Sequence, residues 1–261
     1  MCELFGVSSN RAQPAGAALA EFRLRGGGTA DNSDGWGMAW VENGGFQLQK
    51  EATAAAGSDR FAQLCGTVRS DLVIAHVRKA KWPRVNSFAN THPFLHDCCG
   101  TQWIFAHNGL VPEVIGMESG GDAVICRPGG ETDSEHAFCH LLQHVARTFH
   151  AAVEPSDTAW FATLAAVSAI VAAHGQFNFL MSNGDYLIAY GHDRLHYLEQ
   201  RDGAERALVA TAPLASEQGW TPFRAGELRI YRRGRLVADL DTHPPAPSRM
   251  AEQRRDAAVA H

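Results

Sequence analysis

The second residue of the chain is a cysteine, and this position gives Cys2 chemistry that an internal cysteine lacks. Removal of Met1, which the small side chain of Cys2 favours, would leave a thiol and a free α-amine on one residue. An α-amino group has a pKa of about 7.7–8.0, so part of it is neutral near pH 7 and can accept the thiol proton. A nucleophile that carries its own base needs no separate histidine. The alternative is an ordinary buried cysteine in a strand.

Three further groups of residues would complement such a nucleophile. Asn108 and Gly109 follow an apolar run, and a side-chain amide beside a backbone N–H can stabilise an oxyanion. Arg78 follows another apolar run and can hold a carboxylate through two hydrogen bonds. Asp133 stands at a predicted helix start whose capping its neighbours supply, so its carboxylate is available for a cationic group.

Taken together, these groups predict hydrolysis of a side-chain amide. The Arg78 and Asp133 side chains match the α-carboxylate and α-ammonium of an amino acid, which points to glutamine or a γ-glutamyl compound. Each group also has a simpler reading. Asn-Gly is a common turn pair, and most arginines are solvated at the surface.

Composition excludes several other classes of protein. The 261 residues are 45% hydrophobic and 20% charged, with a net charge of −5. The chain therefore lacks the excess of basic residues that is typical of nucleic-acid-binding proteins. The longest apolar stretch, 160–173, is shorter than the roughly 20 residues of a membrane span. The N-terminus has no signal-peptide pattern, and six cysteines without a Cys-x-x-Cys pair predict reduced thiols in a cytoplasmic protein. We expect neither a metal nor a cofactor.

The pattern of apolar residues and turns predicts one domain over residues 2–242, followed by a flexible tail at 243–261. Two groups of strands are separated by a pair of helices, which favours layered α and β elements. The predicted helices cover residues 14–23, 132–149 and 155–173. The predicted strands are 2–8, 36–41, 46–49, 72–77, 103–106, 177–181, 186–190, 195–198, 208–212, 228–231 and 235–239.

The ordered motifs of the chain resemble those of the class II glutamine amidotransferases, which are N-terminal nucleophile hydrolases. The similarity is greater to their small stand-alone branch, which includes the γ-glutamyl hydrolase of the ergothioneine pathway. The motifs are Met1-Cys2-Glu3-Leu4-Phe5-Gly6, Asp34-Gly35-Trp36-Gly37, Ala75-His76-Val77-Arg78, Asn90-Thr91-His92-Pro93-Phe94, His107-Asn108-Gly109, Thr132-Asp133-Ser134-Glu135 and Phe177-Asn178-Phe179-Leu180-Met181-Ser182.

This resemblance implies an α+β fold, a four-layer αββα sandwich. It implies that Cys2 is the nucleophile and that Asn108 with the Gly109 N–H forms the oxyanion hole. By the same resemblance, Arg78 holds the α-carboxylate of glutamine and Asp133 holds its α-ammonium. An ammonia-accepting synthetase would then act in trans as a separate partner chain.

Four residues inside or near the motifs need separate comment. His92 and His107 are expected to be hydrogen-bonded structural histidines. Lys81 stands where relatives often have a threonine, and Asn32 where they often have a histidine. These two departures leave the chemistry in place and bear on the choice of substrate.

Three alternatives remain open from the sequence. The first is a γ-glutamyl amide hydrolase that releases an amine, with no ammonia transfer. The second is a metalloprotein, because His136, His140 and His144 share one face of a predicted helix, although a solvated histidine face is the simpler interpretation. The third is a non-catalytic binding protein on the same fold, which the presence of Cys2, Asn108 and Asp133 disfavours.

Overall fold

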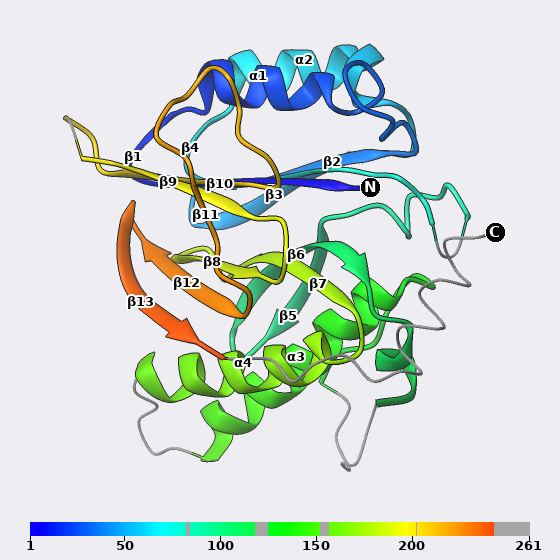
Figure 1. Cartoon of the computed structure of the whole chain (residues 1–261), viewed down its shortest axis with the longest axis vertical. Coiled ribbons are helices and arrows are strands. Elements are labelled where there is room, and N and C mark those ends of the chain that lie inside the picture. Colours follow the sequence, from blue (N-terminus) through cyan, green and yellow to red (C-terminus); the bar gives the residue numbers. More distant parts are fainter. Residues whose placement is uncertain (82–83, 118–124, 152–156, 202, 243–261) are drawn as a thin grey trace.

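The computed structural model describes residues 1–81, 84–117, 125–151, 157–201 and 203–242, and four layers stack along its long axis (Figure 1). Two antiparallel sheets form the middle layers. Helices α1 and α2 cover one sheet, and α3 and α4 cover the other. The α+β, four-layer αββα sandwich predicted from the motifs is therefore confirmed. The predicted tail, 243–261, lies outside the described residues.

The first sheet has seven strands in the order β11-β9-β10-β1-β4-β2-β3. Its central strand is the N-terminal strand β1, which pairs antiparallel with β10 on one side and β4 on the other. The strands are β1 (Glu3–Pro14), β2 (Trp36–Glu42), β3 (Gly45–Glu51), β4 (Arg69–Val77), β9 (His196–Gln200), β10 (Arg206–Ala210) and β11 (Thr221–Pro222).

The second sheet has six strands in the order β13-β12-β8-β7-β6-β5. Neighbouring strands are antiparallel throughout. The strands are β5 (Phe94–Cys98), β6 (Thr101–Leu110), β7 (Gln176–Ser182), β8 (Tyr186–Gly191), β12 (Glu227–Arg232) and β13 (Arg235–Asp241).

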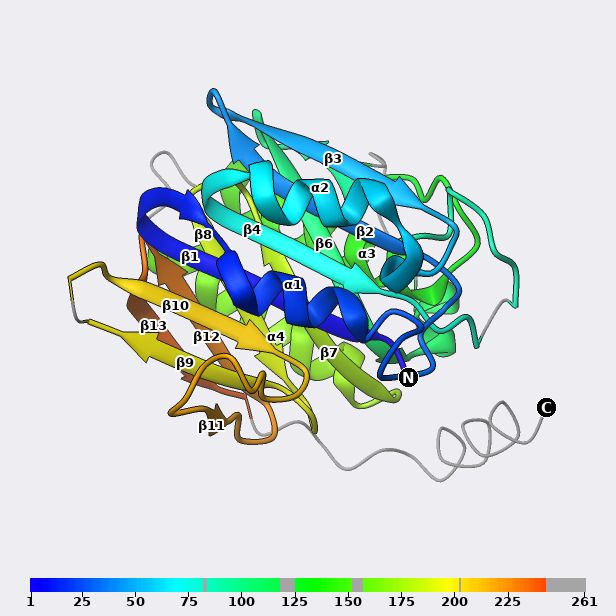
Figure 2. The same ribbon diagram turned by 90° about the horizontal axis from the view of Figure 1, so that it is seen from above.

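The helices lie on the outer faces of the two sheets, as the view from above also shows for α1 and α2 (Figure 2). None of the helices in the described ranges has the length and apolar content that a bilayer span requires. The helical segments are α1 (Gly16–Leu24), α2 (Asp59–Thr67), α3 (Asp133–Ala151), α4 (Asp157–Ala172) and the short 3₁₀ turns Ala55–Gly57 and Pro112–Met117.

Three layers of buried apolar side chains hold the sandwich together. One lies between α1, α2 and the first sheet and includes Phe22 and Phe61. A second lies between the two sheets and includes Leu4 and Ala106. The third is the largest and packs α3 and α4 against the second sheet. The middle layer matters most for function, because it sets the positions of the strands that carry the site.

Most predicted elements are present, with shifted ends. Both predicted hairpins form, and the first turns at Asn43 and Gly44, whose positive φ angles suit a tight two-residue loop. The first helix begins at Gly16 and not at residue 14, because β1 continues to Pro14. The predicted helix 155–173 corresponds to α4, and its first two predicted residues, 155–156, lie outside the described residues. Helix α2 and strand β5 were not predicted.

Candidate functional site

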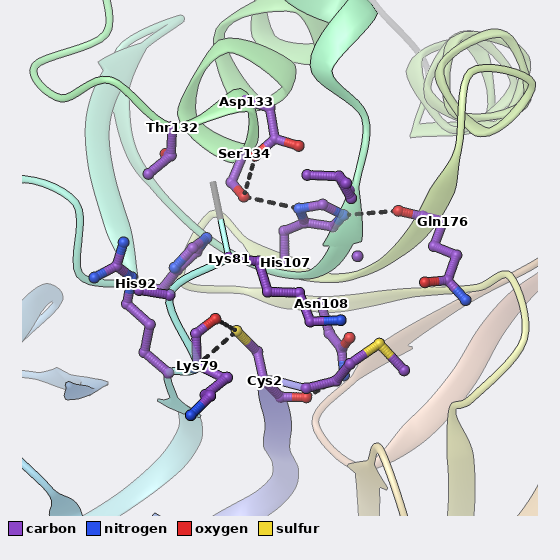
Figure 3. Close-up of a pocket in the computed structure, with 15 residues that line it drawn as sticks. Cys2, Lys79, Lys81, His92, His107, Asn108, Thr132, Asp133, Ser134 and Gln176 are labelled. Atoms are coloured by element: carbon purple, nitrogen blue, oxygen red, sulfur yellow. Dashed lines mark hydrogen bonds between the residues drawn. The ribbon is translucent and has the colours of Figure 1, made fainter. Parts of the chain in front are cut away.

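A pocket opens where the ends of β1, β4 and β6 meet the start of α3 (Figure 3). It brings together all five residues predicted for the site. The lining residues are Met1, Cys2, Arg78, Lys79, Ala80, Lys81, His92, His107, Asn108, Gly109, Leu110, Thr132, Asp133, Ser134 and Gln176.

The register of β1 against β4 positions Cys2. Glu3 pairs with Val77, so Cys2 lies just beyond the paired residues, beside the chain that leaves β4. Its Sγ accepts a hydrogen bond from the Lys79 backbone N–H at 3.2 Å and lies 3.3 Å from the Lys79 carbonyl oxygen, to which the thiol can donate. Burial raises the pKa of the Cys2 thiol, while the Lys79 N–H and nearby positive charges oppose that rise. The thiol is therefore neutral near pH 7 and needs a base to act as a nucleophile.

The Asp34-Gly35-Trp36-Gly37 motif holds the chain after β4 in place. The Asp34 carboxylate accepts from the Ala80 N–H at 2.8 Å, and the Asp34 N–H donates to the Arg78 carbonyl at 2.9 Å. Gly37 lies against the backbone of His92, where a Cβ atom would be only 2.1 Å from the His92 carbonyl oxygen. The glycine thus permits this close packing.

Asn108 reaches Cys2 from the opposite sheet. Its Nδ2 donates to the Cys2 carbonyl oxygen and lies 3.4 Å from Thr211 Oγ1. The Thr211 hydroxyl also accepts from the Leu4 N–H at 2.8 Å. Sequence reasoning missed Thr211, because no motif marks it. The amide group of Asn108 therefore lies beside Cys2, and a ligand oxygen would have to replace one of its two present contacts.

Gly109 and His107 lie within β6 and not in a turn after it, which removes the turn interpretation of Asn-Gly. A Cβ at position 109 would lie 1.8 Å from the backbone oxygen of Gln176, so the close pairing of β6 and β7 requires glycine there. His107 is held on both sides, by the Ser134 hydroxyl at 2.8 Å and the Gln176 carbonyl at 3.1 Å (Figure 3).

Arg78 is buried, and it is one of the residues that line the pocket. One guanidinium nitrogen, Nη1, donates to the Val85 carbonyl at 2.9 Å and is 3.4 Å from Asn86 Oδ1. Burial lowers the pKa of Arg78 from its ordinary value, yet arginine stays protonated in proteins. With Nη1 anchored in this way, the remaining guanidinium donors can bind a carboxylate.

Asp133 begins α3 and is nearly inaccessible to solvent. Its Oδ2 accepts from the Val111 N–H at 2.6 Å, and Oδ1 lies 3.3 Å from the Ser134 hydroxyl. Thr132 caps the helix by accepting from the Glu135 N–H, as predicted. The Glu135 carboxylate, however, accepts from Gly130 and contacts His96. Asp133 is thus not free of partners, but a carboxylate has lone pairs enough for two such contacts and a cation.

One expectation about the histidines is wrong. His107 is hydrogen-bonded as predicted, but His92 has no hydrogen-bond partner at either ring nitrogen within the described residues, and neither has His76. The two rings are tilted by 32° to each other, with centroids 4.3 Å apart. Burial lowers the pKa of His76 to about 3 and that of His92 well below its usual value, so both rings are neutral at pH 7. His92 is among the residues that line the pocket, but both of its ring nitrogens are buried.

The two departures from the family pattern differ in their location. Lys81 lines the pocket and adds a cation to it. The neighbouring Lys79 is paired with Asp31 at 2.7 Å. Asn32 is buried outside the pocket lining, and its Nδ2 donates to the Arg25 carbonyl at 3.2 Å. Of the two, Lys81 is therefore the one placed to act on substrate choice.

The cysteines and histidines also depart from expectation. Cys126 and Cys139 are joined by a disulfide, whereas the sequence predicted only reduced thiols. On the helix face considered for metal binding, the His140 and His144 rings are 4.8 Å apart. The group of potential metal ligands in the described part of the chain is a different one: His96, Cys126 and Cys139.

Comparisons with known proteins agree with these observations. The family profile for class-II glutamine amidotransferases matches residues 1–203. A Haemophilus influenzae protein named as a candidate glutamine amidotransferase is 31% identical, over 92% of this chain and 87% of its own. The γ-glutamyl-hercynylcysteine sulfoxide hydrolase of Mycobacterium tuberculosis is 26% identical over 80% of each chain. A crystal structure of a predicted glutamine amidotransferase from Pseudomonas aeruginosa superimposes with a TM-score of 0.64 at 28% identity, covering 91% of this chain and all of the other.

Proposed function

The chain belongs to the class II glutamine amidotransferases, enzymes that hydrolyse the side-chain amide of glutamine or of a γ-glutamyl compound, and we propose that Cys2 is its nucleophile. The observation that carries this proposal is the contact of the Cys2 residue with both Lys79 and Asn108 at one end of the pocket. Two strands from different sheets thus place a thiol beside a side-chain amide. The catalytic domain in this proposal is residues 2–242.

We assign substrate binding to the two charged groups on the pocket wall. The free guanidinium donors of Arg78 would hold the α-carboxylate of the substrate. The Asp133 carboxylate, whose position is fixed by the Val111 N–H, would hold the α-ammonium. With both charged groups of the α-carbon held, the side-chain amide at the other end of the molecule would extend toward Cys2. Such fixed positioning lowers the entropic cost of the attack.

The reaction starts once Met1 has been removed, because the base is the α-amine of Cys2 itself. The amine takes the thiol proton, and sulfur attacks the amide carbon. The negative charge on the amide oxygen is stabilised by the Asn108 amide and the Gly109 N–H. The nitrogen then leaves as ammonia or an amine, taking the proton. Water hydrolyses the thioester to release glutamate and restore the thiol.

Two finer assignments also belong to this proposal. The first is the substrate. Lys81 adds a cation to the pocket, which favours a γ-glutamyl compound carrying an additional anionic group over glutamine alone. The second is the fate of ammonia. Where glutamine is the substrate, we expect an ammonia-accepting synthetase in trans, in the cytoplasm.

The decisive experiment labels the protein with a glutamine-analogue diazoketone and locates the adduct by peptide mass spectrometry. We expect label on Cys2 of a protein that lacks Met1, and loss of both label and glutaminase turnover in Cys2→Ala. Cys65→Ala is the matched control, since Cys65 is a partly buried free thiol in α2. Mature protein that retains Met1, or turnover unchanged in Cys2→Ala, would overturn the mechanism. Comparing glutamine with γ-glutamyl amides then separates the two substrate classes.

A further inference from the structure

A second cluster of reactive side chains lies outside the pocket, on the α3 side of the second sheet. It consists of His96 in β5, Cys126 in the segment before α3, and Cys139 inside α3. One ring nitrogen of His96 and the two Sγ atoms all lie within 4.8 Å of one another. Three separate pieces of the chain therefore bring their ligand atoms to one point.

We propose that this cluster is a zinc site, formed when the Cys126–Cys139 disulfide is reduced. Two thiolates and an imidazole are the ligand set that Zn²⁺ prefers. Zn–S bonds of about 2.3 Å and Zn–N bonds of about 2.0–2.1 Å separate tetrahedral ligand atoms by roughly 3–4 Å. The three ligand atoms already lie within 4.8 Å of one another, so once the S–S bond is broken the site closes by a small movement of side chains.

A carboxylate beside the histidine supports this assignment independently. Glu135 Oε1 lies 3.0 Å from His96 Nε2, and the other oxygen, Oε2, accepts from the Gly130 N–H at 2.7 Å. Histidines that bind metals almost always donate their second ring N–H to a carboxylate or carbonyl group, which fixes the ring. Glu135 is buried and so supplies this contact in a stable position.

The site would also complete the attachment of an irregular segment. Residues 125–132 form neither helix nor strand. The Ile125 N–H donates to Gln143 Oε1 at 3.2 Å and the Glu131 N–H donates to Asn90 Oδ1 at 2.9 Å. The segment leads directly into Thr132 and Asp133 of the pocket. A metal on Cys126 and Cys139 would tie its start to α3, as the disulfide does in the oxidised chain.

The chemistry requires an external reductant and balances simply. A dithiol passes two electrons and two protons to the Cys126–Cys139 disulfide, breaks its S–S bond, and itself becomes a disulfide. The two resulting thiols lose their protons to solvent as two Zn–S bonds form. Metal binding and oxidation of this pair are therefore mutually exclusive states of the same two sulfur atoms.

The test measures metal content directly. Full-length protein is reduced with a dithiol, incubated with Zn²⁺, desalted and analysed by elemental mass spectrometry. We expect about one zinc per chain, lost in His96→Ala and in Cys126→Ser. Glu135→Gln should weaken zinc binding by about 10–100-fold, the usual cost of removing an outer-shell partner. His140→Ala, next to Cys139 in α3, and Cys98→Ser, two residues from His96 in β5, are the matched controls and should bind normally.

Cobalt supplies a readout that does not depend on a variant folding well. Co²⁺ added to the reduced wild-type protein should give a thiolate-to-cobalt charge-transfer band, and Zn²⁺ should displace it. Reduced protein with all six thiols titratable but no metal bound would overturn the proposal. So would zinc content that is unchanged in His96→Ala, or a Cys126–Cys139 bond that persists under the dithiol and leaves no ligands free.

Discussion

Thr211 connects strand β1 to Asn108, the proposed oxyanion residue, which makes Thr211→Val a sharp test of how the site is held. Its hydroxyl accepts from the Leu4 N–H at 2.8 Å and lies 3.4 Å from Asn108 Nδ2. Valine has nearly the same shape and removes only the hydroxyl. Because Leu4 is fully buried, the variant leaves its N–H without this acceptor. An unsatisfied buried donor costs about 1–3 kcal/mol.

The expected stability loss follows from that cost. In a domain of this size, 1 kcal/mol shifts Tm by about 2–4 °C, so Thr211→Val should unfold about 2–12 °C below the wild type. Thermal unfolding followed by circular dichroism measures this shift. Thr211→Ser is the matched control, because it retains the hydroxyl and should unfold near the wild-type temperature. A valine variant that unfolds with the wild type would refute the assigned hydrogen bond.

Activity reports on the second contact of the same hydroxyl. Without it, the Asn108 amide loses one of the two groups that orient it, and kcat should fall. The decrease should stay below the about 10²–10³-fold loss caused by deleting an oxyanion donor outright. KM should change little, because Thr211 is not one of the residues that line the pocket. Steady-state glutaminase assays decide the matter, and an unchanged kcat would mean that Thr211 does not orient Asn108.

Three further substitutions test the remaining assignments. Asp133→Asn keeps a hydrogen-bond acceptor for Val111 but removes the charge, so KM for glutamine should rise about 10–150-fold, the equivalent of 1.5–3 kcal/mol for a charged hydrogen bond. Steady-state kinetics check this, with Asp97→Asn as the control, because Asp97 is an exposed residue of β5. Gly109→Ala places a methyl against the Gln176 carbonyl and should lower stability by at least about 1–3 kcal/mol in denaturant unfolding, whereas Gly116→Ala, with open space around it, should not. Burial lowers the pKa of Lys50 from 10.5 to about 8. Between these two pH values the unfolded chain binds more protons than the folded chain, so the free energy of unfolding rises with pH. Lys50→Met should therefore be more stable than the wild type at pH 7, and Tm measurements should show that advantage shrinking between pH 8 and pH 10.5.

The sequence predicts the elements whose signals are local. Asn43-Gly44 and the Ser182–Asp185 turn carry the residues that tight turns require, and both hairpins form as expected. Arg78 and Asn108 were predicted as site residues because each follows an apolar run, and Cys2 because it is the second residue of the chain. Helix α2 was missed although Ser58 caps it by accepting from the Phe61 N–H, a signal visible in the sequence.

Contacts between distant strands could not be predicted in this way. Thr211 acts on Leu4 only because β10 pairs with β1, placing Ala210 opposite Phe5. That pairing joins residues some two hundred positions apart, and no local pattern encodes it. The Cys126–Cys139 disulfide could not be predicted either, because spacing alone does not say which of the six cysteines meet. Within the described residues His92 lacks the hydrogen bond expected of it, and its ring packs against the ring of His76, which lies in β4.

The alternation of side chains along the strands explains why the reactive groups meet. Residues two apart in a strand point to the same face. Leu4 lies in the apolar layer between the sheets, so Cys2 continues the same row beyond the end of β1. Ala106 lies in that layer from the other sheet, and Asn108 continues its row in β6. The packed layer between the sheets thus ends in the thiol on one side and the amide on the other. Close-packed interiors resist small displacements, so this layer also fixes the distance between the Cys2 thiol and the Asn108 amide.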